Sequence, residues 1–390
     1  MAKILIFGGS GIISTEIVQL TIQNGHDVTI VNRGRRKAFM HPQAKSIVAD
    51  MQTETIDSLR QKIRGNFDTV IDFLAYTPKE LRRNTELVKG RCSQYIFISS
   101  ATVYNQKDGR FSEDDPIGVS EWSYAVNKAA CERLLVESSK QMGFAYTAIR
   151  PYITYGKTRI PLQFAPIAYY TVIHRMCVGK CVPLFGENVA CTLTSAKDFA
   201  VAAVGLIQNM DAYGEVYHIT GSYETDWETV LAHVAAAFDC IPDIARLPES
   251  ILRNRRLTRG LDVCEILADK GRNMLFNNVK ICRAVPEFQG TTTFDKMLPE
   301  IVAYFTQTSE ARRIDYAWDA RMDRLLYKIS TLNTEQKKKL KFMPCEKAGK
   351  REKWTYLINR NEVLYIAYNV IGKTAKLAMR CLAWMRQRCA

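Results

Sequence analysis

The alternation of strand-like and helix-like segments over the first 155 residues constrains the fold most. Most of the short β-branched or aromatic runs are separated by about 10 to 20 residues of mixed polar and apolar character; the runs are KILIF, DVTIVN, SIVA, TVIDF, YIFIS and YTAIR. Such alternation is typical of a parallel sheet with helices on both faces, because parallel strands need long crossover connections. The sequence therefore predicts an α/β fold with a Rossmann-type doubly wound parallel sheet.

A glycine-rich stretch, FGGSGIIS, lies between the first strand-like run and the first helical pattern. Glycines in this place allow a tight turn and let backbone N–H groups at the helix N-terminus approach a pyrophosphate. The pattern departs from the usual one at Ser14, where a third glycine normally permits close packing of the helix on the strand. A turn that holds no ligand remains the alternative. The predicted dinucleotide contacts here are Gly8, Gly9, Ser10, Gly11 and Ile12.

The end of the second strand-like run indicates which dinucleotide is bound. Asn32 and Arg33 stand where NAD-binding folds carry an acidic residue for the ribose hydroxyls, and three more basic residues follow at 35–37. Guanidinium groups without a carboxylate suit a 2′-phosphate, which favours NADP while NAD remains possible. A solvated basic turn is the alternative. Asp50 and Met51, after the third run, are predicted to contact the adenine.

Three residues form a candidate acid–base site. Tyr124 and Lys128 are four residues apart, so a helix places both side chains on one face. A tyrosine with a pKa near 10 is a poor base at neutral pH unless a nearby ammonium group stabilises its phenolate. Ser100 ends a strand-like run, at the sheet edge where open α/β sheets bind ligands. We therefore predict that Ser100, Tyr124 and Lys128 converge.

These motifs resemble the extended short-chain dehydrogenase/reductase family, which includes NAD-dependent nucleotide-sugar epimerases and dehydratases. The similarity covers roughly residues 1–325 and rests on GGSGIIS, SSATVY, YAVNK, RPYITYG, TSAKDFA and GEVYHITG. The resemblance implies that Ser100, Tyr124 and Lys128 are catalytic, that Tyr124 and Lys128 also contact the cofactor, and that the substrate is a nucleotide sugar. It is imperfect at Ser14 and at Asn105, which stands where a glycine usually follows the Val-Tyr pair.

The residues after Ser100 bear on the type of reaction. Family dehydratases place an acid pair there, whereas this chain has Ala101 and Thr102, which argues against dehydration. Epimerisation through a transient keto intermediate is the favoured prediction, and reduction or oxidation of a nucleotide sugar with NADP(H) is the alternative. Atypical family members with the NRG triplet found at 32–34 bind RNA. The net charge of only +4 over residues 1–330 and the Ser/Tyr/Lys set argue against nucleic acid.

Three domains are expected along the chain. We predict a dinucleotide-binding Rossmann domain at 1–155, a smaller substrate-binding lobe at 156–330 that is interleaved with it, and a basic linker and amphipathic helix at 331–390. The last 60 residues hold 14 basic and 4 acidic residues. Polar or aromatic candidates for substrate contacts are Tyr152, Tyr155, Arg175 and Lys197.

The tail and the cysteines lead to expectations about partners and location. A helix from Leu364 to Met385 would be apolar on one side and basic on the other, which predicts packing on the body or on a second subunit of a homodimer. Peripheral contact with an anionic membrane is the alternative. Eleven cysteines and five histidines lack metal-binding spacing, so no metal is expected, and free thiols are expected in the cytoplasm. Neither a secretory signal nor a membrane span is recognised.

Overall fold

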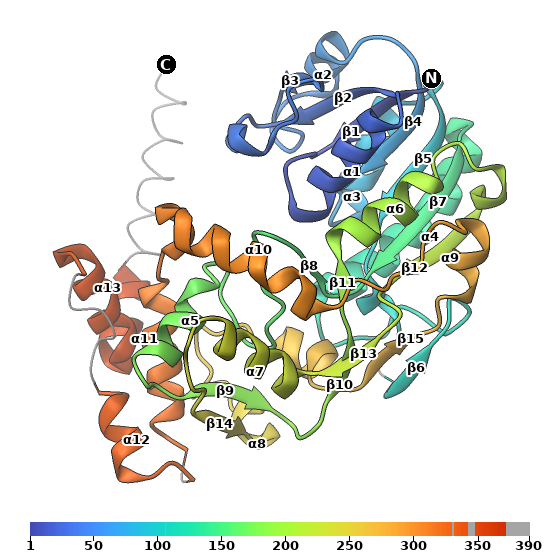
Figure 1. Ribbon diagram of the computed structural model, residues 1–390. Helices are drawn as coiled ribbons and strands as arrows, with labels where there is room; N and C mark the ends of the chain where they lie inside the picture. Colours follow the sequence, from blue (N-terminus) through green and yellow to red (C-terminus); the bar gives the residue numbers. More distant parts are fainter. Residues whose placement is uncertain (106, 330, 342–347, 372–390) are drawn as a thin grey trace, which may run out of the picture. The chain divides into compact units, whose positions relative to one another are not determined.

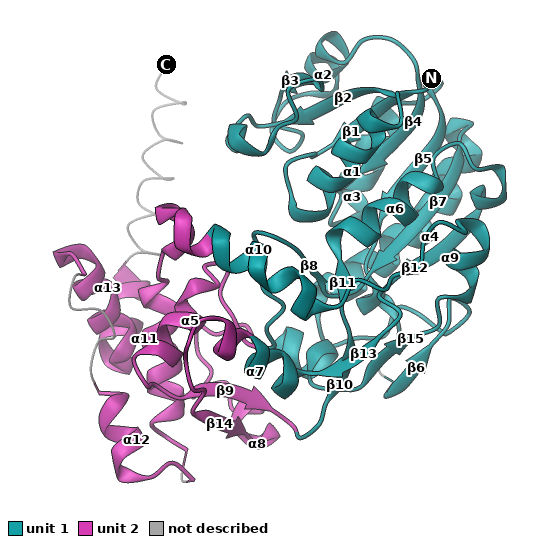
Figure 2. Ribbon diagram, in the orientation of Figure 1, with its two compact units in different colours: residues 1–163, 187–233, 264–304 teal, residues 164–186, 234–263, 305–390 magenta. Residues whose placement is uncertain are grey.

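The computed structural model describes residues 1–105, 107–329, 331–341 and 348–371. They form two compact units, each assembled from segments far apart in the sequence (Figure 2). Unit 1 comprises residues 1–163, 187–233 and 264–304, and unit 2 comprises residues 164–186, 234–263 and the described part of 305–390. The functional domains predicted at 1–155, 156–330 and 331–390 remain a prediction.

Unit 1 contains a seven-stranded parallel sheet in the order β12-β7-β5-β4-β1-β2-β3 (Figure 1). Six of these strands contain the runs expected from the sequence, so the predicted parallel sheet is confirmed. The order reverses direction between β1 and β4, which is the switch point where such sheets bind ligands. The strands are β1 Lys3–Phe7, β2 Asp27–Asn32, β3 Lys45–Val48, β4 Phe67–Asp72, β5 Cys92–Ile98, β7 Ala145–Pro151 and β12 Glu215–Ile219.

Helices cover both faces of this sheet because the strand side chains alternate between them. Ile4 and Ile6 of β1 pack in one apolar core, and Leu5 and Phe7 pack in the other. The first core includes residues of α1 (Ile12–Gln23), α6 (Ala196–Gly205) and α9 (Val279–Ala284). The second includes residues of α2 (Ile56–Lys62), α3 (Pro78–Leu87) and α4 (Ser123–Met142). This three-layer arrangement is the predicted Rossmann-type fold.

Smaller elements complete unit 1. A second sheet has the order β13-β10-β15-β6, and β11 pairs with β8. Two helices, α7 and α10, continue past the sequence boundaries of unit 1. The bounds are β6 Gly109–Phe111, β8 Thr154–Tyr155, β10 Ala190–Thr192, β11 Thr194–Ser195, β13 Glu224–Asp226, β15 Met274–Phe276, α7 Trp227–Ala237, α10 Phe294–Gln307, the 3-10 turns η1 Lys37–Phe39, η2 Ala101–Val103 and η3 Met210–Ala212, and the π-helix η4 Ile266–Lys270.

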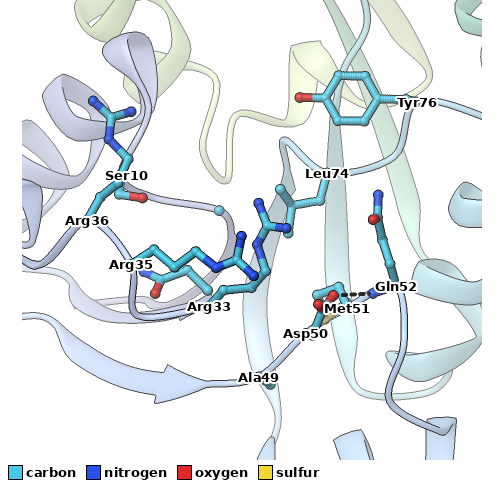
Figure 3. Close-up of a pocket in the computed structure, with 12 residues that line it drawn as sticks. Ser10, Arg33, Arg35, Arg36, Ala49, Asp50, Met51, Gln52, Leu74 and Tyr76 are labelled. Atoms are coloured by element: carbon cyan, nitrogen blue, oxygen red, sulfur yellow. Dashed lines mark hydrogen bonds between the residues drawn. The ribbon is translucent and has the colours of Figure 1, made fainter. Parts of the chain in front are cut away.

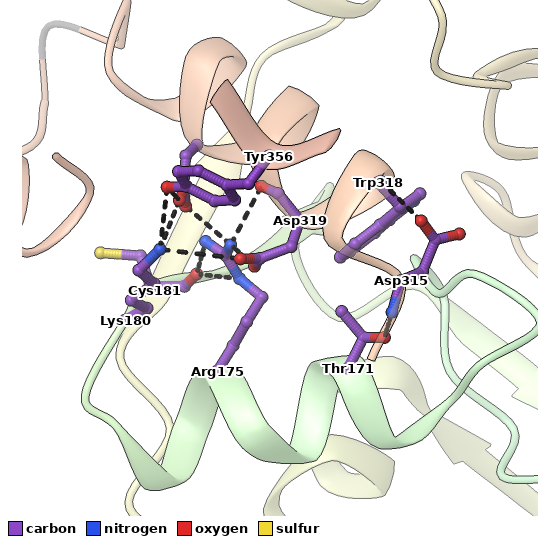
Figure 4. Close-up of polar contacts among 9 residues, drawn as sticks. Thr171, Arg175, Lys180, Cys181, Asp315, Trp318, Asp319 and Tyr356 are labelled. Atoms are coloured by element: carbon purple, nitrogen blue, oxygen red, sulfur yellow. Dashed lines mark hydrogen bonds and ion pairs between the residues drawn. The ribbon is translucent and has the colours of Figure 1, made fainter. Parts of the chain in front are cut away.

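Unit 2 is mainly helical, with one pair of parallel strands, β9 and β14. A buried cluster of charges connects its segments (Figure 4). Its elements are α5 Tyr170–Cys177, β9 Val182–Phe185, β14 Ile244–Leu247, α8 Glu249–Arg253, η5 Ser309–Arg312, α11 Tyr316–Leu326, α12 Thr334–Lys339 and α13 Lys350–Arg360.

The buried charge cluster comprises Arg175, Lys180, Asp319, Asp323 and Tyr356. Arg175 Nη1 lies 2.7 Å from Asp323 Oδ1 and also pairs with Asp319, while Lys180 pairs with Asp323. The hydroxyl of Tyr356, on α13, donates to Asp323. Arg175 is fully buried. Arg175 therefore stabilises unit 2 through buried ion pairs. This role differs from the substrate contact for which the sequence made it a candidate.

One expectation about the cysteines is wrong. Cys177 and Cys240 of unit 2 form a disulfide, although their separation of 63 residues gives no local sign of pairing. Free thiols in the described chain include those of Cys92, Cys131, Cys181, Cys191 and Cys282. The described residues contain no group of three or more His, Cys, Asp or Glu side chains that could hold a metal ion.

The predicted C-terminal helix is seen only in part. Residues 362–371 are helical, and the remainder of the stretch to Met385 lies outside the described residues. Six apolar side chains of the visible part are exposed: Val363, Leu364, Ile366, Tyr368, Val370 and Ile371. No helix in the described chain is long and apolar enough to cross a membrane. The homodimer, the membrane contact and the cytoplasmic location stay predictions.

Candidate functional site

The first of two cavities in unit 1 lies at the carboxyl ends of four neighbouring strands, where a doubly wound sheet is expected to bind a ligand (Figure 3). Its wall follows β1, β2, β3 and β4 in turn. The lining residues are Gly8, Ser10, Asn32, Arg33, Arg35, Arg36, Ala49, Asp50, Met51, Gln52, Leu74 and Tyr76. Six of the predicted cofactor contacts, Gly8, Ser10, Asn32, Arg33, Asp50 and Met51, are thus brought together.

The other predicted contacts in the glycine-rich stretch shape the turn. Gly9 has φ +86°, and a Cβ atom there would lie 2.5 Å from Ile30 Cγ2, so only glycine fits. Gly11 is the N-cap of α1, and Ile12 is its first residue. Neither these two nor Gly9 is among the lining residues of the first cavity. The turn brings the N-terminus of α1 to the cavity that Gly8 and Ser10 line.

Ser14 compensates for the glycine that it replaces. Its side chain is buried, and its Oγ accepts a hydrogen bond of 2.8 Å from the Gly11 N–H. The first N–H groups of a helix have no partner within the helix, so this hydroxyl satisfies one that would otherwise need water or a ligand. The serine therefore caps the start of α1 from within.

We expect Ser14→Ala to destabilise unit 1, because the Gly11 N–H at the start of α1 would lose its acceptor in the protein. Loss of a comparable cap costs about 0.5–2 kcal/mol in the free energy of unfolding. Urea unfolding of the full chain measures this, with Ser139→Ala on α4 as the control that should stay within about 0.5 kcal/mol of wild type. Equal stability of Ser14→Ala and wild type would show that the hydroxyl does not cap the helix.

The end of β2 offers hydrogen-bond donors and positive charge to the first cavity. The Asn32 Oδ1 accepts from the Gly34 N–H at 2.7 Å, while its buried Nδ2 has no partner in the described chain. Arg33 and Arg35 are exposed, and Figure 3 shows their guanidinium groups close together at the cavity. Arg36 stacks on Phe39 at 4.4 Å. A ligand that brings acceptor oxygens, above all an anion, fits these donors.

The opposite wall is partly apolar. Met51 is buried, and Ala49 and Leu74 line the cavity with it. The Asp50 Oδ1 accepts a hydrogen bond of 3.0 Å from the Gln52 N–H, which holds the turn after β3 (Figure 3). A flat ring with polar edges fits such a wall; the adenine contact of Asp50 and Met51 stays a prediction.

The second cavity, of about 250 Å³, contains two of the three predicted catalytic residues. Ser100 follows β5 and caps η2, and its Oγ accepts a 3.0 Å hydrogen bond from Thr102 Oγ1. Tyr124 lies in the first turn of α4, within hydrogen-bonding reach of Ser100. The lining residues are Ser100, Thr102, Trp122, Tyr124, Pro151, Tyr152, Ile153, Thr154, Arg159, Glu265 and Asp269.

Lys128 lies buried beside this cavity, one helical turn beyond Tyr124. Its Nζ donates to the carbonyl oxygens of Ala75 at 2.7 Å and Ile98 at 2.8 Å, which leaves one of its three N–H groups for a further partner. The ammonium nitrogen lies 6.0 Å from the centroid of the Tyr124 ring. Burial lowers the pKa of Lys128 to about 8, against the opposing effect of Asp72.

The protonation state of Tyr124 follows from its surroundings. Burial raises its pKa to about 12, while the hydrogen bond with Ser100 acts in the opposite direction. Tyr124 is therefore a neutral phenol near pH 7, ready to donate a proton to a developing alkoxide. To accept a proton, it needs added positive charge nearby, such as a fully protonated Lys128 or an oxidised nicotinamide.

Tyr76 connects the two cavities. It lines the first cavity, and its ring centroid lies 6.4 Å from that of Tyr124, which lines the second. The Lys128 Nζ is 4.8 Å from the Tyr76 ring centroid. A ligand that extends from the first cavity past Tyr76 therefore reaches the group formed by Ser100, Tyr124 and Lys128.

Sequence reasoning missed several residues of these walls. Tyr76 follows β4 and could have been found by searching the ends of all predicted strands. Arg159, Glu265 and Asp269 come from segments without a recognisable sequence pattern. Of the candidate substrate contacts named from the sequence, Tyr152 lines the second cavity. Tyr155 instead donates to the Thr292 carbonyl at 2.6 Å, and the exposed Lys197 pairs with Glu300 at 2.8 Å.

Residues 84–220 match the model of the NAD dependent epimerase/dehydratase family. A chloroplast stem-loop binding protein of Arabidopsis thaliana is 28% identical over 233 residues, which cover 56% of this chain and 58% of that protein. UDP-glucose 4-epimerase of Lactobacillus helveticus is 29% identical over 171 residues, which cover 38% of this chain and 50% of the enzyme. The chain thus spans only about half to three fifths of the length of these two relatives.

A solved structure of UDP-glucuronic acid 4-epimerase from Bacillus cereus in complex with NAD has a similar fold. It superposes with a TM-score of 0.62 at 17% identity and covers 78% of this chain and 99% of that enzyme. At this low identity, the likeness shows a shared fold alone. It extends well beyond the residues matched by the family model.

Proposed function

Because this chain is related to the NAD-dependent epimerases and dehydratases of the extended short-chain dehydrogenase/reductase family, we propose that it is an NAD(P)-dependent epimerase of a nucleotide-activated sugar. The observation that carries the proposal is the convergence of Ser100, Tyr124 and Lys128 next to a cavity suited to a dinucleotide. Ala101 and Thr102, directly after Ser100, supply no acid for dehydration. The relatives named above include an epimerase of a nucleotide sugar.

The first cavity fits the adenosine end of the cofactor. Asn32 and Arg33 would hold the ribose side, Asp50 and Met51 the adenine, and the turn at Gly8 the pyrophosphate. When bound, the nicotinamide accepts a hydride from the sugar and returns it.

The residues of this chain move the proton that accompanies the hydride. Tyr124 takes the proton of a sugar hydroxyl as the carbon of the same group loses its hydride, and Ser100 donates a hydrogen bond to the oxygen. Tyr124 accepts this proton as a phenolate, which the ammonium of Lys128 stabilises. Tyr124 then returns the proton when hydride is delivered to the other face of the ketone. This second step leaves the epimer and regenerates the phenolate of Tyr124.

A panel of UDP-, GDP-, CDP- and dTDP-sugars tests the proposed reaction. NMR spectra of the products, recorded with and without added NADPH, separate epimerisation from net reduction. An epimerase converts the sugar with a catalytic amount of bound cofactor. A nucleotide-sugar reductase, the alternative, converts it only in proportion to the NADPH supplied. Failure to convert any member of the panel would contradict both.

We further infer that the preferred cofactor is NADP. The unpartnered Asn32 Nδ2 and the guanidinium groups of Arg33 and Arg35 lie at the first cavity without an acidic side chain at the end of β2. A 2′-phosphate would supply negative charge and acceptor oxygens for these donors. NAD offers ribose hydroxyls alone at this position.

Arg33→Ala should therefore weaken NADP binding by about 10- to 100-fold, the effect of one lost charge-assisted hydrogen bond. The dissociation constant of NAD should change by less than about threefold, because NAD lacks the phosphate. Calorimetric titration measures both constants, and Lys37→Ala, in the same loop but not in the cavity wall, is the matched control. Equal losses for the two cofactors would reverse the assignment.

RNA binding is the alternative from another class of function. The similarity to a stem-loop binding protein and the shared NRG triplet at 32–34 favour it. The approach of Ser100 and Tyr124 over a buried Lys128 supports the enzyme. The absorbance of any nicotinamide cofactor that co-purifies with the protein, together with a gel-shift assay on stem-loop RNA, separates the two.

A further inference from the structure

The second cavity is bordered by buried polar groups that have no partner in the described chain. They are Oδ1 of Asp269 and the hydroxyl of Tyr152, both in the cavity wall, and Nε and Nη2 of the neighbouring Arg272. Asp269 and Tyr152 are each 2% exposed. Folded proteins satisfy most buried polar atoms, so a cluster of unsatisfied ones points to a missing ligand.

We propose that Asp269 and Tyr152 form a binding subsite for a hydroxyl group of the substrate sugar, next to the hydroxyl that reacts with Tyr124. This inference rests on the proposed function and adds to it two residues that touch the substrate. The carboxylate of Asp269 accepts a hydrogen bond from the sugar hydroxyl. The hydroxyl of Tyr152 donates one to the same oxygen.

The hydrogen-bonding capacities of the two residues match an alcohol. A sugar hydroxyl donates one hydrogen bond and can accept another, whereas an ionised carboxylate only accepts and a phenol can donate. Asp269 and Tyr152 also interact electrostatically with each other, and the charge of Asp269 reaches Tyr124. Asp269, Tyr152 and the reacting Tyr124 thus line the same cavity.

The other charged groups near Asp269 form no ion pair with it in the part of the chain that the structure describes. The Lys270 Nζ pairs with Glu265 at 2.8 Å and donates to the Leu162 carbonyl at 3.2 Å. Arg272 donates to the carbonyl oxygen of Lys107 at 2.9 Å. These contacts leave the Asp269 carboxylate without a committed cation, so its unsatisfied oxygen is available to a ligand.

The local backbone and the protonation of Asp269 agree with this role. Asp269 belongs to the π-helical turn η4, a geometry that recurs at functional sites. Burial, and to a lesser degree the charge of Glu265, raises its pKa to about 7, while Lys270 and Arg272 act in the opposite direction. A substantial fraction of Asp269 is therefore ionised at neutral pH and can accept the hydrogen bond of a sugar hydroxyl.

Substrate analogues and two variants of the full chain test the subsite. The probes are UDP-glucose and the UDP-deoxyglucoses that each lack one hydroxyl; if another member of the sugar panel is the better substrate, its deoxy analogues replace them. We expect Asp269→Asn and Tyr152→Phe to raise KM by about 10- to 100-fold and to change kcat by less than tenfold. Binding of the cofactor should not change. Asp57→Asn, the same chemical change on the exposed surface of α2, is the control.

The analogues supply a result that a purely structural role would not produce. One deoxy analogue should bind wild type about 10- to 100-fold more weakly than the parent sugar, and this difference should disappear in Asp269→Asn. Retention of the full difference in both variants would overturn the subsite, even if the variants were less stable. If wild type bound and converted no nucleotide sugar, the proposed function itself would fail, which is a separate outcome.

Discussion

Tyr124→Phe should lower turnover of the nucleotide sugar by about 10²–10⁴-fold, because it removes the group that exchanges a proton with the reacting hydroxyl. Phenylalanine keeps the ring and its contacts with Tyr76 and Trp122. The dissociation constant of NAD or NADP should therefore remain nearly unchanged. Steady-state kinetics and cofactor titration on the same preparation measure the two quantities.

Matched variants make this prediction specific. Ser100→Ala should lower turnover by about 10²–10³-fold, as expected for one hydrogen bond made to the developing alkoxide. Lys128→Met should impair both turnover and cofactor binding, because we expect its free N–H to reach the nicotinamide ribose. Tyr146→Phe, on β7 and away from both cavities, is the control that should retain wild-type turnover. Near wild-type turnover of Tyr124→Phe would end the proposed mechanism.

Arg175→Met should destabilise unit 2 by about 3–5 kcal/mol in the free energy of unfolding, the usual cost of removing one partner from a buried ion pair. The variant leaves the buried carboxylates of Asp319 and Asp323 with Lys180 as their remaining cation in the described chain and with the Tyr356 hydroxyl as a donor to Asp323. Methionine fills part of the space but cannot donate to the Cys181 carbonyl, which Arg175 also contacts at 2.7 Å. Denaturant unfolding of the full chain measures the loss.

The control for this experiment is an exposed ion pair in the same unit. Arg253 pairs with Glu249 one turn earlier on α8, and both side chains are about half exposed. Because water screens such pairs, Arg253→Met should cost no more than about 1 kcal/mol. Similar losses for Arg175→Met and Arg253→Met would show that the buried charge cluster is not what stabilises unit 2.

The sequence was most informative where local pattern determines structure. Six short apolar runs predicted six strands of the main sheet, because buried parallel strands need such runs and the intervening segments suit helices. The glycines at 8 and 9 predicted the turn, since both adopt positive φ. Ser100 and Tyr124 could be placed together because one ends a strand and the other begins the next long helix.

Features that depend on long-range packing could not be predicted. Arg175 and Asp319 are 144 residues apart, and Cys177 and Cys240 are 63 apart, so neither pairing has a local signature. Asp269 lies in the π-helical turn η4, where neither periodicity nor a motif in the sequence marks it as part of the second cavity. The effect of Ser14 was also missed, because the glycine pattern suggests a defect where the folded chain gains a helix cap.

Deuterium tracing tests the central claim, that the protein oxidises and then reduces the same carbon of a nucleotide sugar, most directly. The protein is loaded with cofactor and given a nucleotide sugar that carries deuterium on one ring carbon, with each carbon labelled in turn. The account predicts that, for one carbon, the label passes through the cofactor and returns to that carbon with inverted configuration, as NMR of the product reports. An epimer whose inverted carbon has lost its deuterium and carries hydrogen from the solvent would contradict the account.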